Sequence, residues 1–119
     1  MSDKIMEGKI NCPCCGLEPK HNALWVLESI AREYKAKFNK ALKINSGMRC
    51  EKHNTAVGGT KNSAHLEGLA FDLHCPTSQE KYLILKHLFK IGIQRIGVYK
   101  NFIHFDIATD KPQDVVWYS

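Results

Sequence analysis

The chain has 119 residues, of which 44% are hydrophobic and 24% are charged, a composition typical of a single soluble globular domain covering residues 1–119. No apolar run approaches the roughly 20 residues of a membrane-spanning helix, and the opening MSDKIMEGKINCPCCG has no apolar segment of the signal-peptide type. The net charge of +5 comes from scattered lysines, which favours a solvated surface over a polyanion-binding patch.

The first predicted helix begins at Ala23, with Asn22 as its cap, and extends to about Asn39. A short strand in LKINSGMR follows, and CEKHNTAVGGTKNSAH is expected to be a loop because Gly58–Gly59 interrupts it. Apolar residues recur at helical spacing along this helix at Leu24, Leu27, Ile30, Ala31, Tyr34 and Phe38, and the same spacing continues to Leu42 beyond its expected end.

The stretch GLAFDLHC alternates and predicts a strand with one apolar face. That face holds Leu69, Phe71 and Leu73, and the other face holds Asp72 and His74. A second helix is expected to begin at a capping box and to end near the glycine of KIGIQ. The capping-box residues are Thr77 and Glu80, and the apolar positions of this helix are Tyr82, Leu85, Leu88 and Phe89.

The last elements, RIGVY and FIHFDI, flank Lys100–Asn101 and predict a β-hairpin. On its second strand, Phe102, His104 and Asp106 share one face. The order of elements predicts an α+β fold, a small antiparallel sheet with two main helices.

Polar residues in two of these strands suggest a metal site. His65 comes just before the first of them, and Gly68 permits a bend that could bring it back beside Asp72. His104 lies in the middle of the hairpin strand. Two histidines and one carboxylate, with a fourth position for water, form a ligand set of catalytic zinc. The spacing alone leaves open that Asp72 simply points to solvent.

The five cysteines form a separate pattern. Their odd number and the lack of a visible export signal favour reduced thiols. The cluster CPCCG supplies at most three thiolates, whereas a closed structural zinc site needs four ligands. Cys50, Cys75 or His21 could complete such a site only if the fold brings one of them near. Otherwise the cluster is a tight turn with free thiols.

Several segments together resemble one family. SAHLEGLAFD matches the S-x-H-x-x-G-x-A-x-D signature of the zinc D-Ala-D-Ala carboxypeptidases. SGMRCEKHN resembles the S-G-x-R segment of that family, IGVYKNFIHFD resembles its closing strand, and CPCCG resembles a cysteine-containing segment of a small branch. The matches occur in order from about Cys12 to Asp106. The family includes dipeptidases and phage endolysins that cleave peptidoglycan peptides, and it shares its zinc fold with the Hedgehog signalling domain.

The resemblance implies a role for individual residues. His65, Asp72 and His104 would bind one zinc ion per chain. Arg49 would bind the substrate and steady the developing oxyanion, and Ser63 would support the site through the substrate or through a hydrogen bond to the loop. In such peptidases a carboxylate accepts the proton of a zinc-activated water molecule and passes it to the leaving amine.

The chain departs from the family pattern at the expected acid. Many members carry an acidic residue three positions before the last zinc histidine, where this sequence has Asn101. The nearest acid is Asp106, on the same strand face as His104, so Asp106 is the expected acid/base residue. It could instead support a zinc ligand. Glu67, inside the motif, is a weaker candidate.

The expected function is therefore a zinc metallopeptidase that hydrolyses an amide bond of peptidoglycan stem peptides or cross-links. A zinc-bearing domain that only binds peptide or protein is the alternative, and a nucleic-acid-binding cysteine knuckle is less favoured because no basic cluster is interleaved with aromatic residues. The expected partner is a peptidoglycan peptide, with neither nucleic acid nor membrane bound, and the expected state is a monomer. Without a visible signal peptide, the protein would be made in the cytoplasm and act on the wall after release or within a phage particle.

Overall fold

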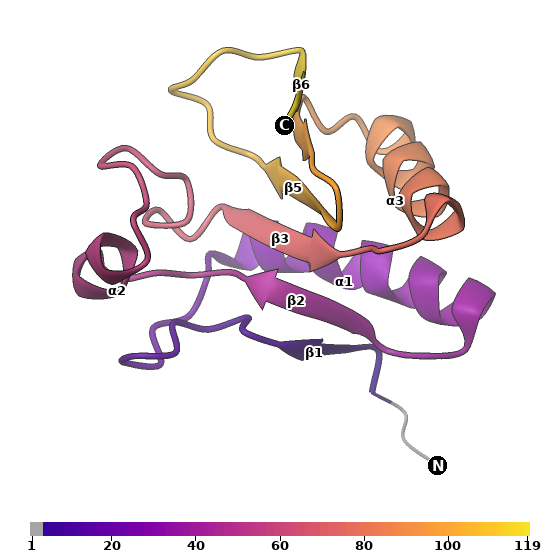
Figure 1. Ribbon diagram of the computed structural model, residues 1–119, viewed down its shortest axis with the longest axis horizontal. Helices are drawn as coiled ribbons and strands as arrows, with labels where there is room; N and C mark the ends of the chain where they lie inside the picture. Colours follow the sequence, from indigo (N-terminus) through magenta and orange to yellow (C-terminus); the bar gives the residue numbers. More distant parts are fainter. Residues whose placement is uncertain (1–3) are drawn as a thin grey trace.

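The computed structural model describes residues 4–119 and builds them into one mixed sheet with flanking helices (Figure 1). The strands run in the order β1-β2-β3-β5-β4-β6. Their bounds are Met6–Gly8 for β1, Leu42–Ser46 for β2, Ala70–His74 for β3, Arg95–Val98 for β4, Phe102–Asp106 for β5 and Val115–Tyr118 for β6. The helices are α1 (His21–Phe38), α2 (Glu51–Ala56) and α3 (Ser78–Lys90).

The α+β class expected from the sequence is confirmed. Strands β2, β3, β5 and β4 pair antiparallel in that order, and the predicted hairpin is β4–β5. The edges differ from the expectation, because β1 joins β2 in parallel and β6 joins β4 in parallel. Neither edge strand has enough alternating residues to signal itself in the sequence.

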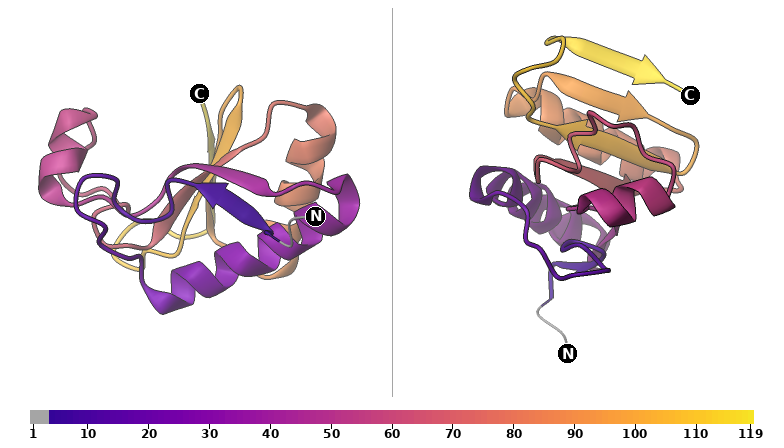
Figure 2. Two further views of the ribbon diagram at one scale, coloured as in Figure 1. Left: turned by 90° about the horizontal axis from the view of Figure 1, so that it is seen from below. Right: turned by 90° about the vertical axis from the view of Figure 1, so that its left-hand side faces the viewer.

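The long helices α1 and α3 cover the same face of the sheet and contact one another (Figure 2). The fully buried Phe71 and Leu73 of β3 and Ile103 and Phe105 of β5 pack against them, as the alternation predicted for both strands. The opposite face of these strands is left for polar side chains. Among residues 4–119, no helix is long and apolar enough to cross a membrane.

Helix α1 has the predicted apolar stripe but a different start. Leu27, Ile30 and Tyr34 are buried along it. The residue before the helix is Lys20, whose side chain makes no capping bond, and Asn22 lies inside the first turn, accepting a hydrogen bond from the N–H of Ala23. The expectation that Asn22 precedes the helix is therefore wrong, because helix formation begins at His21.

Helix α3 begins with the predicted capping box and is fixed by a buried carboxylate. The Thr77 hydroxyl accepts from the N–H of Glu80, and the Glu80 carboxylate accepts from the Thr77 N–H and hydroxyl. The buried Tyr34 hydroxyl also donates to Glu80, linking α1 to α3. Burial raises the pKa of Glu80, but these hydrogen bonds and the Lys40 ammonium outweigh burial and hold it below its usual value.

Two expectations about helices are corrected. Tyr82 and Phe89 are exposed on α3, where Ile84 and Leu88 are the buried apolar residues. The stretch expected to be a loop after Arg49 contains α2, which begins after Cys50 and ends before Gly58–Gly59. The glycines limit this helix to six residues, which is why its periodicity is weak in the sequence.

We expect Glu80→Ala to reduce the free energy of unfolding by about 2–3 kcal/mol, because the change removes a cap and leaves the buried Tyr34 hydroxyl without its acceptor. Urea denaturation followed by circular dichroism measures this. The neighbouring exposed Gln79 provides the control, and Gln79→Ala should stay within about 0.5 kcal/mol of the wild type. Equal effects of the two substitutions would contradict the structural role of Glu80.

Candidate metal centre

Two polar residues face each other across the central strands. The register of the sheet places Asp72 of β3 directly opposite His104 of β5, and His104 opposite Gly97 of β4. These three positions lie on the face away from α1 and α3, which we call the site face. The Nδ1 atom of His104 is 2.9 Å from Oδ1 of Asp72.

His65 reaches the same oxygen from the loop before β3. The Gly68 backbone has a φ of +72°, which provides the expected bend, and the loop is closed by a hydrogen bond from the Leu69 N–H to the Ala64 carbonyl. The buried His65 ring then places Nε2 at 3.4 Å from Oδ1 of Asp72. Its Nδ1 lies 2.8 Å from the Gly47 carbonyl oxygen, which only accepts, so Nδ1 carries the proton.

His104 is held from its other side by a second carboxylate. Its Nε2 donates to Oδ2 of Asp106 at 2.7 Å. The other oxygen of Asp106 accepts from the Arg95 guanidinium at 2.6 Å and from the Ala108 N–H at 3.2 Å. Asp106 is 2% exposed, so both its oxygens are committed to protein donors away from solvent. Its contacts therefore fix the ring of His104.

The charges in this cluster alter the proton affinity of each group. Burial lowers the pKa of His104, but the hydrogen bonds to Asp106 and Asp72 outweigh it and raise the pKa above its usual value. Burial raises the pKa of Asp72, but its hydrogen bonds to His104 and His65 lower it well below the ordinary range. Asp106 is likewise shifted down, by His104 and Arg95 against the effect of burial. Both carboxylates are therefore ionised at neutral pH.

The donor atoms fit a zinc ion. Because Nδ1 of His65 and Nε2 of His104 are committed as donors, the lone pairs of the opposite nitrogens face the Asp72 carboxylate, and a cation or proton is needed between them. The ligand atoms of the three residues all lie within 4.8 Å of one another. Ligands around tetrahedral zinc are separated by about 3.3 Å, given bonds near 2.0–2.1 Å. His65, Asp72 and His104 could therefore hold zinc with little movement.

Arg49 lies beside this cluster and is tightly oriented. Its Nε donates to the Ser46 hydroxyl and its Nη1 donates to Oδ1 of the buried Asn54, each at 3.1 Å. The remaining Nη2 is 3.9 Å from Oδ2 of Asp72. Ser63 is also close to the cluster, where its hydroxyl accepts from the His65 N–H at 3.2 Å. That contact is the loop-supporting hydrogen bond considered for it from the sequence.

Three residues near the centre lie outside the SAHLEGLAFD motif and were not predicted from it: Arg95, Gly97 and Trp117. Trp117 of β6 lies against His104, with ring centroids 5.5 Å apart, and the Arg95 guanidinium lies 5.2 Å from the Trp117 ring centroid. A Cβ at Gly97 would come within 2.4 Å of the indole nitrogen, so glycine is required there for Trp117 to lie on the sheet. The signal for Trp117 is weak because β6 comes after an irregular segment.

Asp106 lies on the same strand face as His104, as expected, and its contact with His104 is the supporting role that the sequence left open for it. The geometry does not support an acid/base role for Asp106, because its carboxylate is buried between His104 and Arg95. Glu67 is exposed and paired with Lys111 at 3.3 Å. Asn101 is exposed in the turn between β4 and β5. His74, two residues beyond Asp72, is not part of the metal-ligand cluster.

Comparison with known proteins identifies a family for these residues. A family model described as Peptidase M15 matches residues 3–106. No curated protein matches the chain. The matched range includes the three candidate ligands and Arg49, and it ends at the last residue of β5, before Trp117.

We expect Asp106→Asn to weaken zinc binding by about 10–100-fold, because the substitution removes the anionic acceptor that orients His104. Zinc affinity can be measured by competition with a chromophoric chelator, with circular dichroism as a check of folding. Glu67→Gln removes a nearby exposed carboxylate and should change the affinity less than about twofold. Unchanged affinity in a folded Asp106→Asn variant would contradict the orienting role.

Proposed function

The chain belongs to the peptidase M15 family of zinc metallopeptidases, and from this premise we propose that it hydrolyses an amide bond in peptidoglycan stem peptides or cross-links. The observation that carries the proposal is the convergence of lone pairs from His65, Asp72 and His104 on one position, with Arg49 oriented beside it. This is the donor set of a catalytic zinc site that keeps a position for water.

Neighbouring groups of the chain orient the two histidines that would hold the metal. Zinc, when bound, supplies Lewis-acid activation of water and of the scissile carbonyl. Asp106 keeps the proton on Nε2 of His104 and so presents Nδ1 to the metal position. The Gly47 carbonyl does the same for His65 by holding the proton on Nδ1. Both imidazoles are therefore oriented before any ligand arrives.

Arg49 is the residue we propose for substrate contact. Two of its nitrogens are tied to Ser46 and Asn54, which leaves Nη2 directed toward the metal position. A guanidinium held in this way suits a carboxylate or a developing oxyanion, and peptidoglycan stem peptides supply both. Charge complementarity between the Arg49 guanidinium and an anionic peptide supports this choice of substrate. We propose that the protein meets this peptide in the cell wall after release or within a phage particle.

A zinc-bearing binding domain is the second candidate, and one observation favours it. The acid of many family members is replaced by Asn101, and Asp106 is committed to His104 and Arg95. A site with a metal and an oriented arginine but no free carboxylate would hold a peptide without cleaving it. Turnover distinguishes this domain from a peptidase.

We expect the zinc-loaded protein to release defined fragments from purified peptidoglycan, identified by mass spectrometry, and to release none after chelation of the metal. Arg49→Gln should lower kcat/KM by about 10²–10³-fold, the usual cost of losing an oxyanion donor. Arg32→Gln, an exposed position on α1, is the matched control and should retain full turnover.

Two outcomes would contradict the proposal. The first is a zinc-loaded wild type that binds stem peptides but releases no fragment, which favours the binding domain. The second is Arg49→Gln with the same kcat/KM as Arg32→Gln, which would remove Arg49 from the site.

A further inference from the structure

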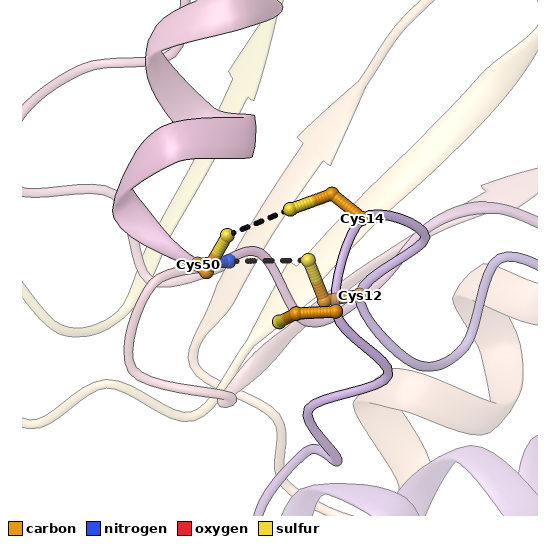
Figure 3. Close-up of side chains that lie close together, drawn as sticks. Cys12, Cys14 and Cys50 are labelled. Carbon is orange, nitrogen blue, oxygen red and sulfur yellow. Dashed lines mark hydrogen bonds between the residues drawn. The ribbon is translucent and has the colours of Figure 1, made fainter.

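A second group of potential metal ligands lies outside the centre described above. It consists of four cysteines, one buried, two exposed and one half-buried, and their sulfur atoms all lie within 4.8 Å of one another. Figure 3 shows the sulfurs of Cys12 and Cys14 directed toward Cys50. The four residues, which we call the cysteine cluster, are Cys12, Cys14, Cys15 and Cys50.

Three of the sulfurs come from a single tight turn. The Gly16 N–H donates to the Cys12 carbonyl at 2.7 Å, and the Cys12 N–H donates to the Leu17 carbonyl at 2.9 Å. The Gly16 φ of +77° lets the chain reverse within this turn. In the sequence, Cys12 and Cys15 are separated by two residues, the spacing common in structural zinc sites, and Cys14 lies between them.

The fourth sulfur arrives from a distant part of the chain. Cys50 immediately precedes α2, and its N–H points at the Cys12 sulfur at 3.4 Å. The His53 N–H in turn lies 3.5 Å from the Cys50 sulfur. The Cys14 and Cys50 sulfurs are 3.2 Å apart, and all four thiols are free. The Cys50 N–H directed at the Cys12 sulfur favours the thiolate of Cys12, the form that binds metal.

The segment that carries this turn has little else to hold it in place. Within residues 11–20, only Cys12 and Pro19 are buried, so little apolar contact is available to offset the cost of ordering the segment. Small protein segments of this kind are commonly fixed by a disulfide or a metal. A four-thiolate metal site would supply that constraint here.

We infer that the cysteine cluster binds a second zinc ion, which is structural and is separate from the ion proposed at His65, Asp72 and His104. Four sulfurs at about 2.3 Å from a tetrahedral zinc are about 3.8 Å apart, within the spread of this cluster. Binding deprotonates the thiols and closes the coordination sphere, so no position is left for water. The sequence offered three of these ligands and left the fourth open, and the fold supplies Cys50.

This second ion would connect the N-terminal segment to the residues that build the centre of His65, Asp72 and His104, which we call the first centre. Cys50 is the neighbour of Arg49, and the Met48 N–H bonds to the Ile10 carbonyl at 3.0 Å. A Cβ at Gly47 would lie 2.4 Å from that same carbonyl oxygen, so the two segments touch through their backbones. Zinc in the cysteine cluster would thus hold residues 47–50, which position both Arg49 and the carbonyl that orients His65.

The experiment is to count zinc per chain by mass spectrometry of the native protein, and to record the absorption spectrum of the cobalt-substituted protein. We expect two zinc ions per chain in the wild type. The double variant Cys14→Ser, Cys15→Ser should keep one and lose the thiolate-to-cobalt charge-transfer band. The double variant His65→Ala, His104→Ala should keep one zinc and retain that band.

Cys75 provides the matched control for loss of a thiol. It is fully buried, and burial raises the pKa of its thiol to about 12, so it stays protonated. Cys75→Ala should keep two zinc ions. The inference is overturned by a Cys14→Ser, Cys15→Ser variant that keeps two ions, or by a wild-type cobalt spectrum without a thiolate band. A mass of the denatured, metal-free chain that is lower by two hydrogens, with peptide mapping that locates a Cys14–Cys50 disulfide, would overturn it as well. The first centre failing to bind zinc would leave the thiolate band intact, so the two claims are tested separately.

Discussion

The pairing of Asp72 with His104 across β3 and β5 is the contact on which the candidate site depends. The strand register puts the two side chains opposite each other on the site face, and the apolar neighbours of both residues pack under α1 and α3. A slip of one residue would send Asp72 into the core and Phe71 to the surface. The hydrophobic core therefore fixes the position of the polar centre, because the same register satisfies both.

The desolvation cost of placing these polar groups together indicates that the cluster has a functional role. Asp72, Asp106 and His104 are charged or polar groups held largely out of water, and removing charge from water is expensive unless partners compensate. The Arg95 guanidinium balances the charge of Asp106. The Asp72 oxygen that both imidazoles face could have its charge balanced by a bound cation. Perturbed groups gathered in this way are typical of functional sites.

The sequence predicts which face of a strand each residue occupies better than it predicts which residues of other strands that residue contacts. Alternation in GLAFDLHC and FIHFDI correctly places Asp72 and His104 opposite the core, because apolar burial has a period of two in a strand. Helix α2 was not predictable, since six residues give too little periodicity. The contacts of Asp106 with Arg95 and of Trp117 with His104 depend on β4 and β6, which meet these residues only in the folded sheet.

The cysteines of the N-terminal segment also meet a partner that the sequence pattern does not predict. The pattern CPCCG identifies three sulfurs, but the fourth lies 36 residues from Cys14, and the backbone contacts among Ile10, Gly47 and Met48 bring it near. Spacing in the sequence cannot reveal such a meeting, because it depends on β1 joining β2 in parallel. The cysteine cluster and the first centre are thus supported by one segment, residues 47–50.

The most direct test of the account is a crystal structure of the zinc-loaded protein with anomalous diffraction data at the zinc edge. The account predicts an anomalous peak between Nε2 of His65, the Asp72 carboxylate and Nδ1 of His104, with Nε2 of His104 still bonded to Asp106. A peak bound through Nε2 of His104, or no peak among these three residues, would contradict it.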